Sequence, residues 1–278
     1  MRREFQRVAL AIAMCGMIGA CASTGRNKMI PMNSGNVNRS VDHVSESSAD
    51  KRKDAARVRV ELGQQYMQLG KLELALENLQ KALQYDDDYV DAHTVIAVLY
   101  ERLGNTEQAG EHYARAVELA PKSGDTNNNY GQFLCAKGKY DEAQKYYAQA
   151  MRDPFYKTPA VVYANAGVCL VDHGGGLRLD EAETDFRRAL EADPKSPLAL
   201  FYLARVMYSK NDYFHARAFV QRFEALGHPD PAALLLARNI EVKLGHADAA
   251  RDYAQRLRKD FPDSQQTHSL DAVAPPPQ

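Results

Sequence analysis

An interval of 34 residues recurs through the central part of the sequence. It separates the members of two sets of small residues, Gly70, Gly104 and Gly138 in one and Ala75, Ala109 and Ala143 in the other. A repeat of this length in a helix-forming sequence indicates helical hairpins, each too small to bury its own apolar face. The interval therefore predicts an all-α fold, a right-handed superhelix (solenoid) of about six stacked hairpins.

The recurring residues match the tetratricopeptide-repeat (TPR) pattern. A small residue in the first helix and an alanine in the second allow close approach, and the glycine between them allows the left-handed backbone of a helix end. We place the six repeats at residues 53–264, with prolines ending the second helix at Pro121, Pro194 and Pro262. The fifth and sixth repeats match least well, as terminal repeats often do. Extra residues around Gly174 should lengthen the loop between the two helices of the fourth repeat.

The N-terminus has the features of a lipoprotein signal. Residues 1–20 combine a basic start with a short apolar run that ends in small residues. The sequence Ile18-Gly19-Ala20-Cys21 resembles the lipobox of bacterial lipoproteins, so we expect Cys21 to be acylated and to become the first mature residue. The alternative is that Cys21 merely ends a plain signal peptide. Because Ala22 and Ser23 follow with no Asp, we expect sorting to the outer membrane of a Gram-negative bacterium, facing the periplasm.

The regions that flank the repeats differ from them in composition. Residues 21–52 are rich in Ser, Asn and Gly after the lipidated Cys, and we interpret them as a flexible tether. Residues 265–278 end in Pro275-Pro276-Pro277 and are predicted to be a disordered tail.

Composition and motifs argue against several classes of function. The formal net charge is −1 at pH 7, and no stretch combines Lys and Arg with aromatic residues as nucleic-acid-binding surfaces do. None of the eight His is paired at metal-ligand spacing. Asp172-His173 lacks a nucleophile motif nearby, so we interpret it as loop surface. We therefore expect no enzymatic activity, metal, cofactor, small-molecule substrate or nucleic-acid partner.

Two further cysteines fall in the expected first helices of the third and fourth repeats. Cys135 lies four residues after the small residue Gly131, whereas Cys169 lies two residues after Gly167, which places them on roughly opposite helix faces. Cys135 can then face the next repeat and Cys169 the preceding one, within disulfide distance across packed helices. We expect a Cys135–Cys169 disulfide in an oxidising compartment, and the alternative is two buried thiols.

Four segments are similar to a known family beyond the general TPR pattern. They are Asn128–Cys135 (NNYGQFLC), Gly138–Ala143 (GKYDEA), Asp153–Tyr156 (DPFY) and Asn165–Cys169 (NAGVC). Together with the lipobox and tether, they resemble the type IV pilus biogenesis lipoproteins of the PilF/PilW family, the pilotins of the outer-membrane secretin. Members of that family similarly carry a Cys pair in these two helices.

The resemblance implies a binding protein. A pilotin binds secretin subunits in the periplasm, travels with them through the lipoprotein export machinery, is held on the membrane by its acyl chains, and promotes secretin assembly. One alternative is a periplasmic TPR scaffold lipoprotein for outer-membrane or cell-wall assembly enzymes. An alternative from another class is a periplasmic enzyme or metal carrier, against which the missing nucleophile and ligand sets argue.

The first helices of TPR stacks line the concave side, where a partner segment can cross several repeats. Asn side chains there can donate to and accept from a partner backbone, and aromatic side chains supply anchoring area. The alternative for any one residue is that it packs between repeats. The expected partner-binding residues are Gln64, Met67, Thr94, Val98, Glu101, Asn128, Asn129, Gln132, Asn165, Phe201, Arg205 and Tyr208.

Overall fold

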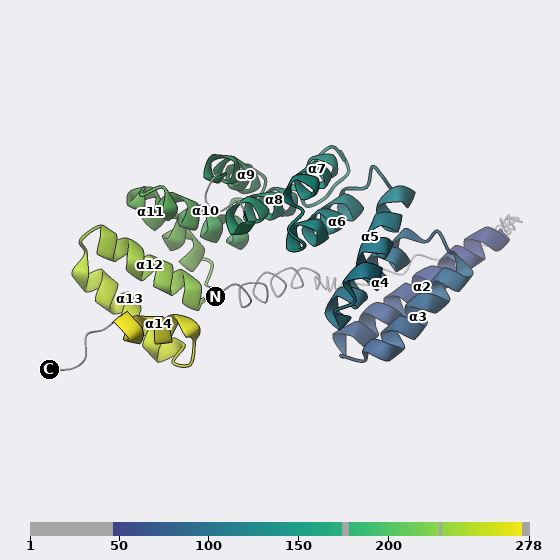
Figure 1. The fold of residues 1–278 in the computed structure, drawn as a ribbon, viewed down its shortest axis with the longest axis horizontal. Helices are drawn as coiled ribbons and strands as arrows, with labels where there is room; N and C mark the ends of the chain where they lie inside the picture. Colours follow the sequence, from purple (N-terminus) through teal and green to yellow (C-terminus); the bar gives the residue numbers. More distant parts are fainter. Residues whose placement is uncertain (1–46, 174–177, 228–229, 274–278) are drawn as a thin grey trace, which may run out of the picture. The chain divides into compact units, whose positions relative to one another are not determined.

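The computed structural model describes residues 47–173, 178–227 and 230–273, and every regular element among them is an α-helix. Successive helices pair as antiparallel hairpins, as the repeat interval predicts, and a further helix follows the last pair (Figure 1). The hairpins are α2 (Ser48–Gln68) with α3 (Leu72–Tyr85), α4 (Val90–Leu103) with α5 (Thr106–Leu119), α6 (Gly124–Ala136) with α7 (Tyr140–Ala150), α8 (Pro159–His173) with α9 (Leu179–Ala192), α10 (Pro197–Ser209) with α11 (Tyr213–Glu224), and α12 (Pro231–Lys243) with α13 (Ala247–Asp260); the last helix is α14 (Gln265–Val273).

Each hairpin closes where a small residue of its first helix meets a large side chain of its second. Gly167 of α8 lies against Phe186 of α9, so closely that a Cβ at Gly167 would be 2.8 Å from two ring carbons. Ala182 and Ala189 flank Phe186 on α9, and all three are fully buried. The small residues at this place in the six first helices are Gly63, Ala97, Gly131, Gly167, Ala204 and Ala237.

The turn inside most hairpins requires a left-handed residue. Gly104 ends α4 with φ of 78°, and the N–H groups of Gly104 and Asn105 bond back to carbonyls of the last helical turn. The fifth hairpin has no glycine here, and Asn211 takes the same role with φ of 62°. Asn tolerates this conformation better than other non-glycine residues do.

The hairpins stack mainly through the contact of each second helix with the first helix of the following hairpin, and most neighbouring first helices also contact each other. α2 packs on α4, α6 on α8, α8 on α10 and α10 on α12, whereas among the described residues no second helix packs closely on the second helix of the next hairpin. Each second helix instead contacts the first helix of the following hairpin, as α9 contacts α10. The first helices therefore crowd together on the inner side of the stack, and in Figure 1 α7 and α9 lie outside α6, α8 and α10.

The repeats extend further at both ends than the sequence predicts. α2 begins at Ser48 rather than at residue 53, because Ser47 and Asp50 form a reciprocal capping box at its N-terminus. The signal, Cys21 and most of the expected tether lie outside the described residues, as do the glycines between α8 and α9.

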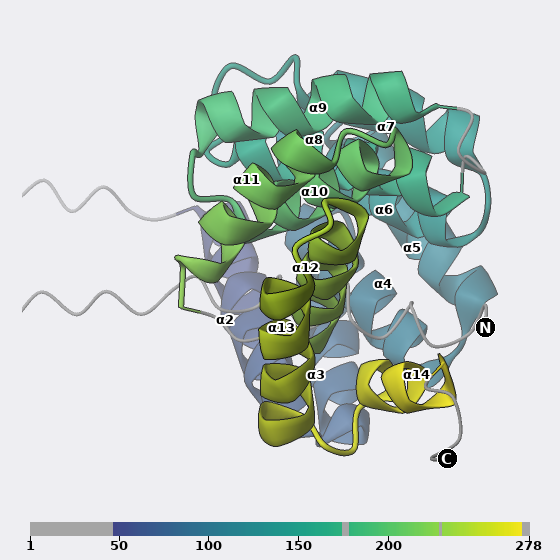
Figure 2. The ribbon, with the colours of Figure 1, turned by 90° about the vertical axis from the view of Figure 1, so that its left-hand side faces the viewer.

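The prediction of a disordered tail is wrong for residues 265–273, which form α14. This helix packs on both α12 and α13 and lies across one end of their hairpin (Figure 2). Leu270 is buried there against Leu234 and Leu257. Thr267 fixes the turn before the helix, since its hydroxyl donates to the carbonyl of Phe261 at 2.7 Å. Because the residues around Leu270 are mostly polar, the burial of this side chain was not predicted from the sequence.

We expect Leu270→Ala to lower the free energy of unfolding of the last hairpin by about 2 kcal/mol, because it removes buried side-chain volume that nothing else fills. Hydrogen exchange of α12 and α13 measures this local stability. The matched control is Leu69→Ala, since Leu69 is 67% exposed and its truncation should change little. Equal effects of the two variants would contradict a packed α14.

Candidate partner-binding face

One side of each first helix is open to solvent. Each residue turns an α-helix by about 100°, so the residue directly after the small residue and the residue six before it share one side of the helix. None of the residues at these positions is buried. We call the surface that they form the inner face; its residues are Arg57, Gln64, Asp91, Val98, Asp125, Gln132, Val161, Val168, Leu198, Arg205, Pro231 and Arg238.

The residues predicted to bind a partner differ in how far they reach solvent. Gln64 and Gln132 are exposed, and most of the others are half-buried: Thr94, Val98, Glu101, Asn129, Asn165, Phe201, Arg205 and Tyr208. Met67 and Asn128 are buried, at 6% and 5% exposure. They lie four residues after and three before the small residue of their helices, which turns them toward the next hairpin rather than toward the inner face. The prediction is wrong for these two residues.

Asn128 is a contact between hairpins. Its Oδ1 accepts a hydrogen bond of 3.0 Å from Nδ2 of Asn165, which joins α6 to α8. A buried amide is costly to desolvate unless it is hydrogen-bonded, so this pair aligns the two helices. Asn129 and Gln132 remain available to a partner in this part of the face.

Glu101 is also engaged within the protein. Its Oε2 accepts a 2.7 Å hydrogen bond from the hydroxyl of Tyr113 on α5. Burial raises the pKa of Glu101, while the Tyr113 hydrogen bond and the charge of Lys137 act in the opposite direction. Thr94 donates to the carbonyl of Val90 in its own helix. These two side chains offer a partner less than their position suggests.

The strongest polar cluster of the inner side joins α8 to α10. The guanidinium of Arg205 lies 4.7 Å from the ring centre of Tyr202 and 3.3 Å from a carboxylate oxygen of Asp172. The hydroxyl of Tyr202 donates to the other oxygen of Asp172 at 3.0 Å. Asp172 is exposed, as interpreted from the sequence, but it lies in a helix rather than a loop, because α8 continues through this residue. Phe201 completes the cluster beside Arg205.

Arg238 belongs to the same face, and it is not among the partner-binding residues predicted from the sequence. It directly follows Ala237 on α12, as Arg205 follows Ala204 on α10. The weak match of the sixth repeat concealed this equivalence, which aligning the small residues of the first helices would have exposed.

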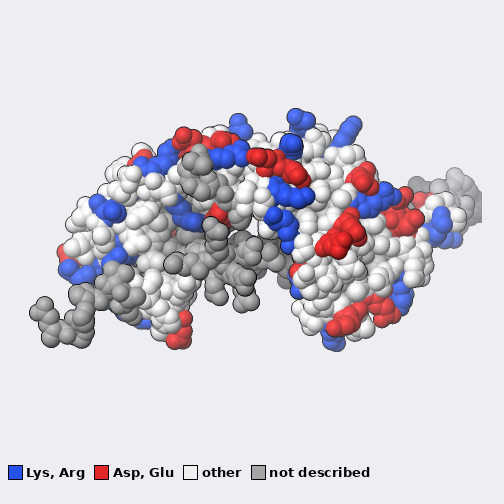
Figure 3. Space-filling model, in the orientation of Figure 1, with Lys and Arg blue, Asp and Glu red and all other residues white. Residues whose placement is uncertain are grey.

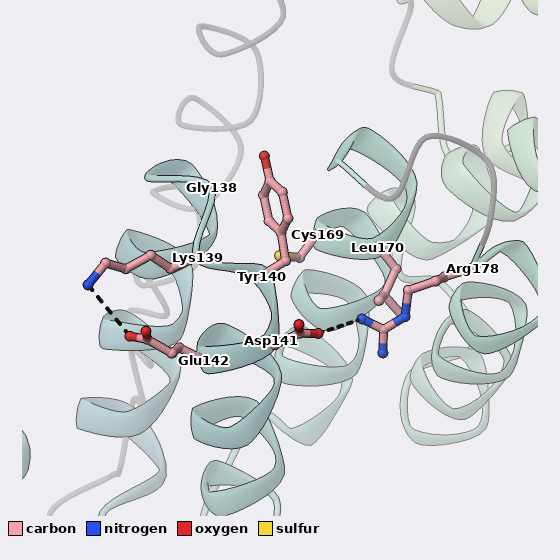
Figure 4. Close-up of a pocket in the computed structure, with 8 residues that line it drawn as sticks. All are labelled: Gly138, Lys139, Tyr140, Asp141, Glu142, Cys169, Leu170 and Arg178. Carbon is pink, nitrogen blue, oxygen red and sulfur yellow. Dashed lines mark hydrogen bonds and ion pairs between the residues drawn. The ribbon is translucent and has the colours of Figure 1, made fainter.

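The two cysteines of the third and fourth hairpins form a disulfide between α6 and α8. The Sγ atoms are 2.18 Å apart and the Cα atoms 5.8 Å apart. Beside it lies a pocket of about 400 Å³ that Cys169 helps to line (Figure 4). The charged groups that line the pocket pair with one another, Arg178 with Asp141 at 3.2 Å and Lys139 with Glu142 at 3.6 Å. A ligand there would have to displace these ion pairs.

Other kinds of site find little support in the described part of the chain. No three His, Cys, Asp or Glu side chains of the described residues are grouped to hold a metal ion. Lys and Arg alternate with Asp and Glu over the surface visible in Figure 3, rather than gathering in a patch of one sign. Among the described helices, none combines the length and apolar character needed to span a membrane.

Comparison with known proteins identifies the repeats. Models described as TPR repeat and tetratricopeptide repeat match residues 63–104, 90–123 and 112–145. A model of subunit 3 of the anaphase-promoting complex matches residues 177–257. The type IV pilus assembly protein PilF of Pseudomonas aeruginosa is 28% identical over 216 residues, which cover 77% of this chain and 84% of PilF. An uncharacterised protein of Haemophilus influenzae is 40% identical over 41% of this chain and 64% of its own length.

Two solved structures share both fold and sequence. PilW, described as a widely conserved type IV pilus biogenesis factor, superposes with a TM-score of 0.72 at 29% identity, over 77% of this chain and 97% of PilW. Pseudomonas aeruginosa PilF gives a TM-score of 0.72 at 26% identity, over 81% of this chain and all of the PilF chain. The chain is a tetratricopeptide-repeat protein homologous to PilF and PilW. The resemblance to the PilF/PilW family predicted from the sequence is thereby confirmed, and so is the superhelical TPR fold.

Loss of the disulfide should weaken the fold without abolishing it. Replacing Cys135 and Cys169 together with Ser should lower the free energy of unfolding by about 3–4 kcal/mol on the loop-entropy model, because the bond closes a long loop. The melting temperature of the variant measures this, with reduced wild type as the control. Alkylation of Cys135 and Cys169 in denatured, unreduced protein would contradict the bond.

Replacement of two amide side chains of α6, those of Asn128 and Gln132, should affect stability differently. Asn128→Ala leaves the Asn165 amide without its buried acceptor and should cost about 1–2 kcal/mol of stability. Gln132→Ala, on the exposed side of the same helix, should leave the melting temperature nearly unchanged. Thermal melts of the two variants side by side test the assignment, and it fails if Gln132→Ala is the more damaging.

Proposed function

We propose that this protein is an outer-membrane lipoprotein that binds secretin subunits of the type IV pilus and promotes their localisation and assembly. The observation that carries the proposal is the homology to PilF and PilW, which extends over nearly the whole of both solved chains. TPR stacks are scaffolds for protein partners, and the open inner face of the first helices offers a surface for one.

Membrane attachment follows from the lipobox in this proposal. Acyl chains on Cys21 contribute roughly 0.8 kcal/mol for each buried methylene, and two or three chains exceed what stable anchoring requires. Residues 21–46 separate the anchor from the capping box of α2. A tether of that length reaches about 25–30 Å on average. The repeats would then face the periplasm, close to the outer membrane but free to turn toward a partner.

Lipoprotein export and partner binding would together promote secretin assembly. Lipoprotein export delivers the acylated chain to the outer membrane, and a secretin subunit bound to the inner face is carried as cargo. Binding also covers apolar surface of the subunit until neighbouring subunits replace it. No step in this sequence requires a catalytic group, which agrees with the scaffold character of TPR domains.

Cys21→Ser separates binding from delivery. The variant should incorporate no labelled palmitate and should still capture secretin subunits, because the inner face is intact. Secretin multimers should then be depleted from the outer-membrane fraction at least several-fold. Membrane fractionation with secretin immunodetection measures this, and a matched Ser23→Ala variant should fractionate as wild type does.

Three results would count against the proposal. Palmitate incorporation into the Cys21→Ser variant would reject the lipid site. Wild-type protein recovered with the inner membrane would reject the sorting. Capture of cell-wall enzymes in place of secretin from a solubilised envelope would favour the scaffold alternative.

A further inference from the structure

The inner face changes character halfway along the stack. In the first three hairpins its residues are Arg57, Gln64, Asp91, Val98, Asp125 and Gln132, of which only Val98 is apolar. In the last three they are Val161, Val168, Leu198, Arg205, Pro231 and Arg238, of which only the two arginines are polar. Equivalent positions of equivalent helices therefore present two different chemistries to a partner.

The apolar half is open rather than covered. Val161 on α8 is 43% exposed, and Val242, which lies one turn beyond Arg238 on α12, is 47% exposed. Val168 on α8 and Leu198 on α10, which belong to the same face, are half-buried. Apolar side chains therefore occupy equivalent positions on three successive first helices, unlike the scattered apolar residues of an ordinary protein surface.

The guanidinium groups of the two arginines differ in their partners within the protein. Arg205 stacks on Tyr202 and shares Asp172, so its guanidinium is held in place before any partner arrives. Arg238 is half-buried, and its guanidinium donates to the neutral side chain of Asn239 at 2.9 Å. Among the described residues no carboxylate pairs with Arg238. A partly desolvated guanidinium without a counter-ion favours a carboxylate from outside the protein.

The polar half of the face repels such a group. Asp91 and Asp125 begin α4 and α6. Burial raises the pKa of Asp125, and the negative charges of Asp153 and Asp91 raise it further. Arg57 pairs with Asp54 and Glu61 and offers little compensation. An acidic segment is thus directed away from the first three hairpins and toward the last three.

We propose that the inner face of α8, α10 and α12 binds an acidic amphipathic segment of the partner, with its apolar side on the valines and Leu198 and its carboxylates on Arg205 and Arg238. The identity of the partner rests on the proposed function, whereas the chemistry of the segment does not. Helix axes packed 8–10 Å apart place α8 and α12 about 16–20 Å from each other. A helical segment of roughly 11–13 residues spans this distance.

The test uses peptide probes of defined chemistry and the full chain. Three labelled 18-residue helical peptides differ only in composition: a Leu stripe flanked by Glu, the same stripe flanked by Lys, and Glu with the Leu replaced by Ser. Fluorescence anisotropy should show the Leu/Glu peptide binding at least tenfold more tightly than either of the others. Its affinity should fall as salt is added, because the arginine contacts are screened.

Variants of the face locate the binding. Arg238→Glu should weaken binding of the Leu/Glu peptide about tenfold and improve binding of the Leu/Lys peptide. Arg251→Glu is the matched control on α13, since Arg251 is exposed and lies on a second helix. Val161→Ser with Val242→Ser should also weaken binding about tenfold. Val58→Ser on α2 should not, although Val58 is exposed to the same degree, at 46%.

A spectroscopic reporter checks the site independently. The chain contains no Trp, so Val161→Trp introduces a single emitter on the face, and Phe214→Trp introduces one on α11, where Phe214 is 72% exposed. The Leu/Glu peptide should shift the emission of the first to the blue and leave the second unchanged. Melting temperatures of all variants exclude unfolding as the cause.

The outcomes separate this inference from the proposed function. Equal affinity for the Glu and Lys peptides, or loss of binding in a Gln64 and Gln132 double alanine variant but not in Arg238→Glu, overturns the inference. If the wild type captures secretin and the Arg238→Glu variant captures it equally well, the inference is overturned and the pilotin proposal stands. Failure of wild type to capture secretin overturns the pilotin proposal, and the peptide preferences still decide the inference.

Discussion

The contact between a bulky side chain of the second helix and a small residue of the first sets the geometry of each hairpin. Leu79 lies on Gly63, Tyr147 on Gly131 and Phe186 on Gly167, and in each case an added Cβ would come within 3 Å. Burial of such a side chain contributes roughly 1.5–3 kcal/mol. The larger effect is on alignment, because the contact fixes which residues of the first helix face the second helix, the neighbouring hairpins and the solvent.

The inner face follows from that alignment. Because Gly131 faces Tyr147, the next residue, Gln132, must point to solvent. Cys135 lies one turn after Gly131 and must point to the next hairpin. The disulfide to Cys169 and the Asn128–Asn165 hydrogen bond both lie on this interface between α6 and α8. A covalent bond and a partly buried amide pair therefore hold the two halves of the stack together at the place where the inner face changes from polar to apolar.

The repeat interval was enough to predict the helices, their pairing and the inner side of the stack, because each depends on small residues spaced along one chain. It was not enough to predict which inner residues are free. Met67 and Asn128 hold the same helix positions as the half-buried Tyr208 and Phe201, so position alone does not decide how far a neighbouring hairpin covers them. The contacts of Asp172 were not predicted for a related reason, since its partners Tyr202 and Arg205 belong to another repeat. Leu270 lies in a polar segment without periodicity, so its burial depends wholly on contacts outside that segment.

The helix that follows the last hairpin makes the two ends of the array unequal. An internal hairpin is supported from both sides, and α14 gives the last hairpin a substitute for its missing neighbour. At the other end, Val58 occupies a place where the later hairpins bury Ala92, Thr126, Val162 and Ala199, yet it is 46% exposed among the described residues. In a linear array, cooperativity passes between nearest neighbours. Thermal fraying should therefore start at the α2–α3 end and diminish toward the disulfide, giving the molecule a gradient of rigidity along its length.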